Sequence, residues 1–237
     1  LTDSVRGYYI YLDLNNLQAD AFGLAKPEYG KISTHLEANF KGNSIDEMRG
    51  AMTARNTRVG SLAMSELTLS ATPEDADHKN LRLESDALTT TVGGRFAYAD
   101  LPLMVQHICY EMLPADLQLV KQPDSAAMAT IEGNTMNFHL RLNDATVLNQ
   151  TLQKVNIAPG TRIDGTYNSN DLLRLVGRSE AAQIGSVAVS DIGLYSYYEN
   201  GIYHVDIESS DINVGEGLEL FKDLNLQLAS NKQQAEI

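Results

Sequence analysis

Apolar and polar residues alternate one by one along much of this chain. In residues 32–40, Ile32, Leu36 and Phe40 fall on one side of an extended strand, while polar side chains such as Glu37 fall on the other. The same period recurs in residues 8–14, 67–71, 81–83, 136–142, 203–207 and 224–228. A period of two is typical of a sheet with one apolar and one solvated face, so we expect a β-sheet protein.

Short polar connectors separate these alternating segments. Residues 41–46 and 72–77 are rich in turn-forming side chains, and Asn200-Gly201 carries the signal for a tight hairpin. Hairpins join antiparallel neighbours, and no long amphipathic helices alternate with the strands, which disfavours a parallel sheet. The predicted fold class is therefore all-β and mainly antiparallel. Residues 171–176 are compatible with a helical turn or a strand, and we favour the strand.

Residues 101–113 break the alternation. Their apolar residues follow a helical period, and one helix face collects Leu101, Met104, Val105, Ile108 and Met112. Asp100 is a suitable N-cap, Pro102 suits a first turn, and Pro114 ends the pattern. We predict one short helix near 101–113, lying against the sheet or closing one end of it.

Charge and composition exclude several functions. The 237 residues include 31 acidic and 18 basic side chains, giving a net charge of −13 without a Lys/Arg cluster, which argues against a nucleic-acid partner. The single cysteine allows neither an internal disulfide nor a thiolate zinc site. No apolar run approaches the roughly 20 residues that a membrane-spanning helix needs.

The residue types that carry catalysis show no recognisable motif. The five histidines are far apart, match no metal-ligand spacing and are expected at the surface. Gly93-Gly94 lacks the third glycine of a dinucleotide fingerprint and is expected in a turn or bulge, and no serine lies on a glycine-flanked elbow. We therefore expect no catalytic residues, no metal and no cofactor, and we do not expect an enzyme.

The domain organisation is simple. Residues 80–101 and 201–224 share a weak strand–turn–strand repetition, and no clean linker interrupts the chain. We predict a single β-rich, repeat-like segment over 1–237 that belongs to a larger protein, with a weak break near 121–125. Two arrangements of the apolar faces remain. Two sheets can pack face to face as a β-sandwich, or one elongated sheet can curl around an apolar groove, and periodicity does not separate them.

Three runs resemble a known family. YIYLDLNNLQADAFGL (9–24), GKISTHLEANFKG (30–42) and LESDALTTTVGGRF (83–96), followed by ADLP (99–102), are similar to the TamB branch of the AsmA-like proteins, in the version of the Bacteroidetes. The resemblance covers most of the chain and implies a long sheet curled into a taco-like trough with a hydrophobic interior. It carries no catalytic residues across, and the helix near 101–113 departs from the plain family pattern.

The resemblance also implies a function and a location. Such proteins are anchored in the inner membrane of Gram-negative bacteria by an N-terminal helix, here outside the chain, and extend through the periplasm towards the outer membrane. The expected function is phospholipid transport between the two membranes, with acyl chains as the partner. The alternative is assembly of outer-membrane β-barrel proteins, whose strands would pair with an exposed sheet edge. The expected lipid-groove lining is Ile32, Leu36, Phe40, Leu81, Leu83, Phe138, Leu140, Leu142, Val205 and Ile207.

Overall fold

The computed structural model describes residues 5–18, 31–60, 62–75, 77–112, 121–146, 149, 155–214, 219–230 and 235–236. Within these ranges the chain forms one sheet of fourteen strands and two helices. The elements up to the first helix are β1 (Gly7–Gln18), β2 (Lys31–Lys41), the 3₁₀ turn η3 (Ile45–Glu47), β3 (Arg49–Val59), β4 (Leu62–Ala71), β5 (His78–Ser85), β6 (Leu88–Arg95), η4 (Tyr98–Asp100) and α1 (Leu101–Met112). They are followed by α2 (Ser125–Ile131), β7 (Thr135–Leu142), β8 (Val155–Ile157), β9 (Arg162–Asn168), β10 (Leu172–Ile184), β11 (Val187–Glu199), β12 (Ile202–Val214), β13 (Glu219–Ser230) and β14 (Ala235–Glu236).

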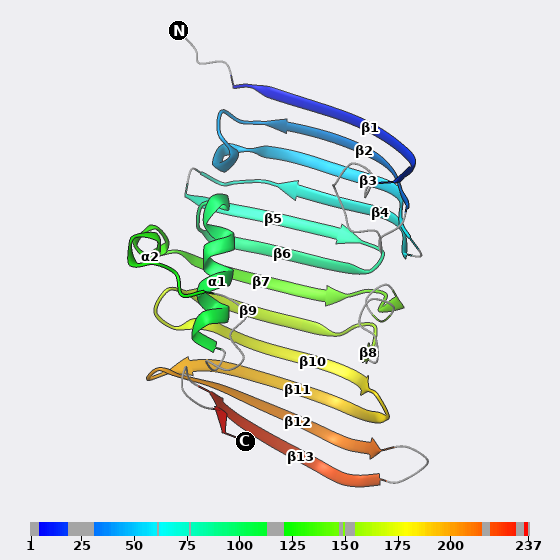
Figure 1. Cartoon of the computed structure of the whole chain (residues 1–237), viewed down its shortest axis with the longest axis vertical. Coiled ribbons are helices and arrows are strands. Elements are labelled where there is room, and N and C mark those ends of the chain that lie inside the picture. Colours follow the sequence, from blue (N-terminus) through cyan, green and yellow to red (C-terminus); the bar gives the residue numbers. More distant parts are fainter. Residues whose placement is uncertain are drawn as a thin grey trace.

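Each strand is added to the sheet beside the strand that precedes it. The order runs from β1 to β14 without a crossover, except that β7 pairs with β9 while the short β8 pairs with β10. All of these pairings are antiparallel, and Figure 1 shows the strands stacked from β1 to β13 as one elongated, curled and unclosed sheet. The predicted all-β, antiparallel curled sheet is therefore confirmed. The alternative β-sandwich is wrong, because successive hairpins extend one growing edge and the sheet never doubles back to face itself.

Two local predictions about turns have opposite outcomes. Asn200 and Gly201 have φ of 54° and 80° between β11 and β12, which confirms the tight hairpin. Gly93 and Gly94 instead lie inside β6, so the expected turn or bulge is wrong. Gly94 has φ of 147°, and a Cβ atom there would lie 2.2 Å from the carbonyl oxygen of Thr135. The glycine is required because β7 approaches the backbone closely at this point.

The curl has a local cause in a line of backbone irregularities. Asn16 in β1, Asn56 in β3, Asp191 in β11 and Asp223 in β13 all adopt a left-handed φ between 50° and 54°. Because neighbouring strands are antiparallel, these four residues lie towards the same side of the sheet, opposite the side where α1 follows β6. The pairing register shifts beside Asn16 and Asn56, and a residue in this conformation bends its strand; Asn and Asp tolerate the conformation best. Figure 1 shows the strands bending at that side.

Helix α1 supplies the densest packing in the described residues. It covers Leu101–Met112 and crosses the central strands on one side of the sheet (Figure 1), which confirms the predicted helix and its position; residue 113 lies outside the described residues. Met104 and Ile131, from α1 and α2, are fully buried together with Phe96, Tyr167 and Leu172. The η4 turn leads directly into α1, and the Asp100 carboxylate accepts a hydrogen bond from the Asn134 amide at 2.9 Å.

The buried side of α1 differs from the predicted one. Leu101, Met104 and Ile108 face the core as expected, but Val105 is 57% exposed. Leu103 joins the core cluster, and His107 is buried, which also corrects the expectation of surface histidines. The positions of the apolar residues alone predict that the buried face of the helix is centred near Val105. The hydrogen bond between the His107 ring and the Tyr167 hydroxyl, 3.2 Å long, makes burial of His107 possible and accompanies the rotation of that face.

Candidate functional site

The candidate site is one whole face of the sheet, here called the apolar face. Residues directly opposite each other in antiparallel strands share a face, so the pairing register shows which side chains form continuous rows. Two such rows cross twelve strands, from β1 to β13 without β8. At about 4.8 Å between neighbouring strands, each row is about 50 Å long. The alternation found in single segments therefore adds up to a surface that runs across the sheet, perpendicular to its strands.

The first apolar row has ten apolar side chains, one threonine and one glycine. In strand order it consists of Ile10, Ala38, Met52, Leu69, Leu83, Thr90, Leu140, Ile163, Gly177, Leu194, Ile207 and Leu226. The second apolar row lies two residues along each strand and consists of Tyr8, Phe40, Gly50, Ala71, Leu81, Val92, Phe138, Gly165, Leu175, Ser196, Val205 and Leu228. No ionisable side chain other than that of Tyr8 interrupts either row.

All ten residues predicted to line a groove lie on this face. Leu83, Leu140 and Ile207 belong to the first row, and the second row contains Phe40, Leu81, Phe138 and Val205. Ile32, Leu36 and Leu142 lie on the same face nearer the bend, opposite Val59, Ala54 and Leu88. Nine of the ten are half-buried and Leu142 is 4% exposed. The sequence thus placed these side chains on one surface, and their role towards lipid stays a prediction.

Two aromatic residues of the second row each have a glycine as the next residue in the row. Phe138 in β7 lies over Gly165 in β9, where an added Cβ atom would come within 2.2 Å of the ring. Phe40 in β2 similarly faces Gly50 in β3, whose φ is 146° and whose added Cβ would lie 2.0 Å from the Asn39 carbonyl oxygen. Gly165 therefore leaves room for the Phe138 ring, whereas Gly50 leaves room for the close approach of the β2 backbone.

Helix α1 covers part of the apolar face. The cluster around Met104 takes in Val92 from the second row and, beyond that row, Met136, Tyr167 and Leu173, which are paired across β7, β9 and β10. No residue of the first row belongs to this cluster as the structure describes it. The helix therefore covers the sheet beside the second row and leaves the first row outside its contact.

Burial beneath α1 changes the acidity of two tyrosines. Removal from water raises the pKa of Tyr167 to about 12, because the ionised phenolate would be poorly solvated there. Burial also raises the pKa of Tyr98, whose hydroxyl has no hydrogen-bond partner, and the nearby charge of Asp46 acts in the same direction. The Lys79 ammonium lies 5.3 Å from the Tyr98 ring. Both phenols are therefore neutral at physiological pH and act as packing groups.

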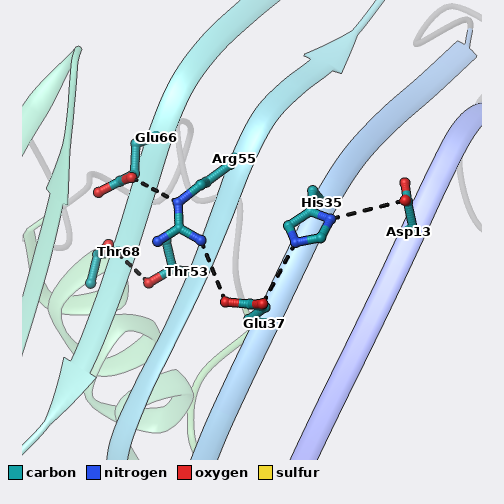
Figure 2. Close-up of polar contacts among 7 residues, drawn as sticks. All are labelled: Asp13, His35, Glu37, Thr53, Arg55, Glu66 and Thr68. Carbon is teal, nitrogen blue, oxygen red and sulfur yellow. Dashed lines mark hydrogen bonds and ion pairs between the residues drawn. The ribbon is translucent and has the colours of Figure 1, made fainter.

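The opposite side of the sheet, the polar face, carries a row of acidic and basic side chains on β1 to β4. Figure 2 shows Asp13, His35, Arg55 and Glu66 on four successive strands, β1 to β4. The His35 ring lies 4.0 Å from the Asp13 carboxylate, and the Arg55 guanidinium contacts Glu66 at 3.1 Å and Glu37 at 3.4 Å. Opposite charges on neighbouring strands stabilise the pairing. Asp13, Arg55 and Glu66 are exposed and His35 is half-buried, so the row keeps this face solvated.

Shallow grooves lie on the polar face over the later strands. One, of about 590 Å³, is lined by Arg141, Arg162, Asp164, Arg178, Glu180 and Asp191, among others. Its neighbour, of about 400 Å³, shares Val176 and Arg178 with it and extends over β12 and β13. Sequence reasoning missed these grooves and also missed row members such as Ile163 and Leu194. The signal that finds both is the hairpin register, which short alternating segments do not contain.

The described ranges contain neither a cluster of metal ligands nor a membrane-spanning helix. No three His, Cys, Asp or Glu side chains converge there in a way that could hold a metal ion. Neither described helix has the length and apolarity required to cross a bilayer. Comparison of the chain with known families, with characterised proteins and with solved structures found no match. The fold and the site define the class of the protein, an open curled antiparallel sheet with one apolar face.

Proposed function

We propose that the apolar face binds phospholipid acyl chains, and that the chain is a periplasmic segment that carries lipid between the inner and outer membranes. The two apolar rows that cross twelve strands are the observation on which this proposal rests. The similarity of three sequence runs to the TamB branch of the AsmA-like proteins is the basis for the proposed location and for the proposed transport between the two membranes.

The chemistry of the rows suits a mobile hydrocarbon. Each CH₂ group that leaves water for an apolar surface gains about 0.8 kcal/mol, and the contact has no preferred direction. Because the rows repeat at every strand, an acyl chain that moves from Leu83 towards Leu140 exchanges one leucine contact for another. No polar group of the first row, apart from the Thr90 hydroxyl, would hold a chain at one place.

Helix α1 restricts this path. It packs beside the second row and buries Met136, Tyr167 and Leu173, so an acyl chain that passes the helix is directed to the first row. Leu140 and Ile163 occupy the first row at the strands that α1 crosses. The proposed path therefore passes the helix at these two residues, with the headgroup left in water.

A photocrosslinking experiment tests the proposal. A photoreactive amino acid replaces Leu83 on the apolar face or, as the matched control, its exposed chain neighbour Glu84 on the polar face. The protein is produced in the periplasm of a Gram-negative host, irradiated and analysed by mass spectrometry. We expect phospholipid adducts at position 83 and at most a tenth as many at position 84. Equal labelling at both positions, or none at 83, contradicts lipid binding by this face.

One observation favours a second function, the pairing of β1 with a strand of an outer-membrane protein. β1 has a partner on one side, β2, and its exposed residues include Tyr9 at 68%, Tyr11 at 55% and Ile10 at 53%. Asp13 is its one charged residue, and β1 contains no proline or lysine of the kind that protects natural edges. Among the described strands, β1 is thus an edge suited to β-augmentation.

Hydrogen exchange tests this second function. An outer-membrane β-barrel protein, unfolded in urea and diluted into buffer, is mixed with the chain, and exchange of backbone amides is followed by mass spectrometry. We expect slower exchange in β1 and unchanged exchange in the interior strand β5. If β1 amides exchange equally fast with and without the barrel protein, strand pairing at this edge is refuted.

A further inference from the structure

Three arginines lie side by side across three neighbouring strands of the polar face. Arg141 in β7 is directly opposite Arg162 in β9, and Arg162 is directly opposite Arg178 in β10. All three side chains are exposed, and all three line the groove of about 590 Å³. They are separated by 21 and 16 positions in the chain, so the register of the sheet is what brings them together. We call them the arginine row.

The arginine row contrasts with the row of acidic and basic side chains on β1 to β4. There, the Arg55 guanidinium lies between the carboxylates of Glu37 and Glu66, and the His35 ring lies between those of Asp13 and Glu37 (Figure 2). Like charges directly opposite each other destabilise a strand pair, and Cβ atoms at such positions are about 5 Å apart. The arginine row contains two such pairs in succession, in a chain whose net charge is −13. A bound anion removes this repulsion.

The carboxylates around the arginine row have partners of their own. Asp164 accepts a hydrogen bond from the His139 ring, and Asp191 accepts one from the Ser210 hydroxyl at 3.0 Å. Among the described residues, no carboxylate lies within 4.0 Å of the guanidinium groups of the row. Glu180 borders this groove, and Asp206 and Glu208 line the neighbouring groove that Arg178 also lines. The guanidinium groups are therefore available to a ligand from solution.

The space around Arg178 also suits a ligand. Its strand neighbour in β11 is Gly193, where an added Cβ atom would lie 3.7 Å from the Arg178 guanidinium. The missing side chain leaves Arg178 accessible from the groove of about 400 Å³ as well as from the larger one. Planar guanidinium groups recognise tetrahedral oxyanions through paired N–H donors, and three of them at a spacing of about 5 Å can contact one phosphate group together.

We propose that the arginine row binds a phosphate group, carried by inorganic phosphate or by a phospholipid headgroup. This site is on the face opposite the apolar rows and does not depend on acyl-chain binding. The oxygens of the phosphate accept hydrogen bonds from the guanidinium groups of Arg141, Arg162 and Arg178. Arg162, which has an arginine on either side, makes the central contact.

Nuclear magnetic resonance of the arginine side chains tests the site. The Nε–H signals of the labelled full chain are followed during titration with sodium phosphate, with sodium chloride holding the ionic strength constant. The variants are Arg162→Gln and, as the matched control, Arg174→Gln, which removes an equally exposed arginine of the same face whose neighbour is Thr166. Loss of one charge-assisted contact is expected to weaken phosphate binding about tenfold in Arg162→Gln and less than twofold in Arg174→Gln.

Vesicles separate the two sources of the phosphate group. Sedimentation with phosphatidylglycerol vesicles is compared with phosphatidylcholine vesicles for the same three proteins. Phosphatidylglycerol binding that is lost in Arg162→Gln and kept in Arg174→Gln assigns the row to a lipid headgroup. Saturable binding of inorganic phosphate without vesicle binding assigns it to free phosphate. If neither probe distinguishes the two variants, or if the wild-type signals respond to phosphate as they do to chloride, the proposal is overturned.

Discussion

Replacing Gly165 by alanine tests whether the apolar face is open to solvent. The new Cβ atom would lie 2.2 Å from the Cζ atom of Phe138 and 2.9 Å from a methyl group of Leu175, so the ring has to move by more than 1 Å to restore ordinary contact. On an open face the ring swings away into solvent. The cost is then that of a strained rotamer and some lost burial, about 1 kcal/mol of unfolding free energy.

Gly50 provides the matched control within the same row. An alanine Cβ there would lie 2.0 Å from the Asn39 carbonyl oxygen and 2.8 Å from the Phe40 Cα atom, and φ is 146°. These are backbone atoms of a paired strand, which cannot move without breaking the ladder. The expected loss for Gly50→Ala is about 3 kcal/mol or more, irrespective of what covers the face.

Urea denaturation followed by circular dichroism measures both losses. The double variant Gly165→Ala/Phe138→Leu is included, because the shorter side chain removes the clash and is expected to recover most of the loss caused by Gly165→Ala. A loss in Gly165→Ala as large as that in Gly50→Ala would show that the Phe138 ring has no room to move. The apolar face would then be covered by a packed layer, and acyl-chain binding to the second row would be refuted.

Three further predictions concern the core beneath α1. Met104→Ala is expected to lower the unfolding free energy by about 2–5 kcal/mol in urea titrations, because Met104 is fully buried. Tyr98→Phe is expected to raise it by about 1 kcal/mol, because it removes a buried hydroxyl without a partner. Above pH 10 the unfolded chain releases the Tyr167 proton while the folded chain, with the pKa at about 12, retains it. Stability therefore falls by up to about 1.4 kcal/mol per pH unit between pH 10 and 12, and Tyr167→Phe reduces this slope in pH-dependent thermal melts.

The alternating pattern predicted strands well where the strand is regular. β2 and β7 keep one period from end to end, and their residues lie where the pattern places them. β3 and β11 were not recognised, because each contains a residue in the left-handed conformation that shifts the period. In β11 the apolar positions change from odd to even numbers at Asp191, so Val189 and Ile192 lie on the same side in spite of their spacing. The residues that bend the sheet therefore interrupt the two-residue period by which these strands could have been recognised.

The choice between a sandwich and a single curled sheet depends on connections that the alternating period does not encode. Both folds need an apolar side on every strand, so residues such as Leu83 and Leu140 satisfy either one. The order in which the strands pair decides between the two folds, and that order depends on all of the turns together. The arginine row has the same origin. Arg141, Arg162 and Arg178 are unremarkable in the sequence and become neighbours through two pairings of β9.

An open apolar face has an energetic consequence that favours occupancy. Leu83 and Leu140 each lie beside Thr90 in the first row, yet both leucine side chains retain accessible surface. Each Å² of apolar surface left in water forgoes about 25 cal/mol, and that amount is returned to any apolar ligand that covers it. A second sheet would bury this apolar surface permanently when the protein folds. Without a second sheet, the same energy remains available for reversible binding along the first row, which α1 leaves uncovered. Repeated contacts of similar kind along that row favour a ligand that moves over one that is held at a single place.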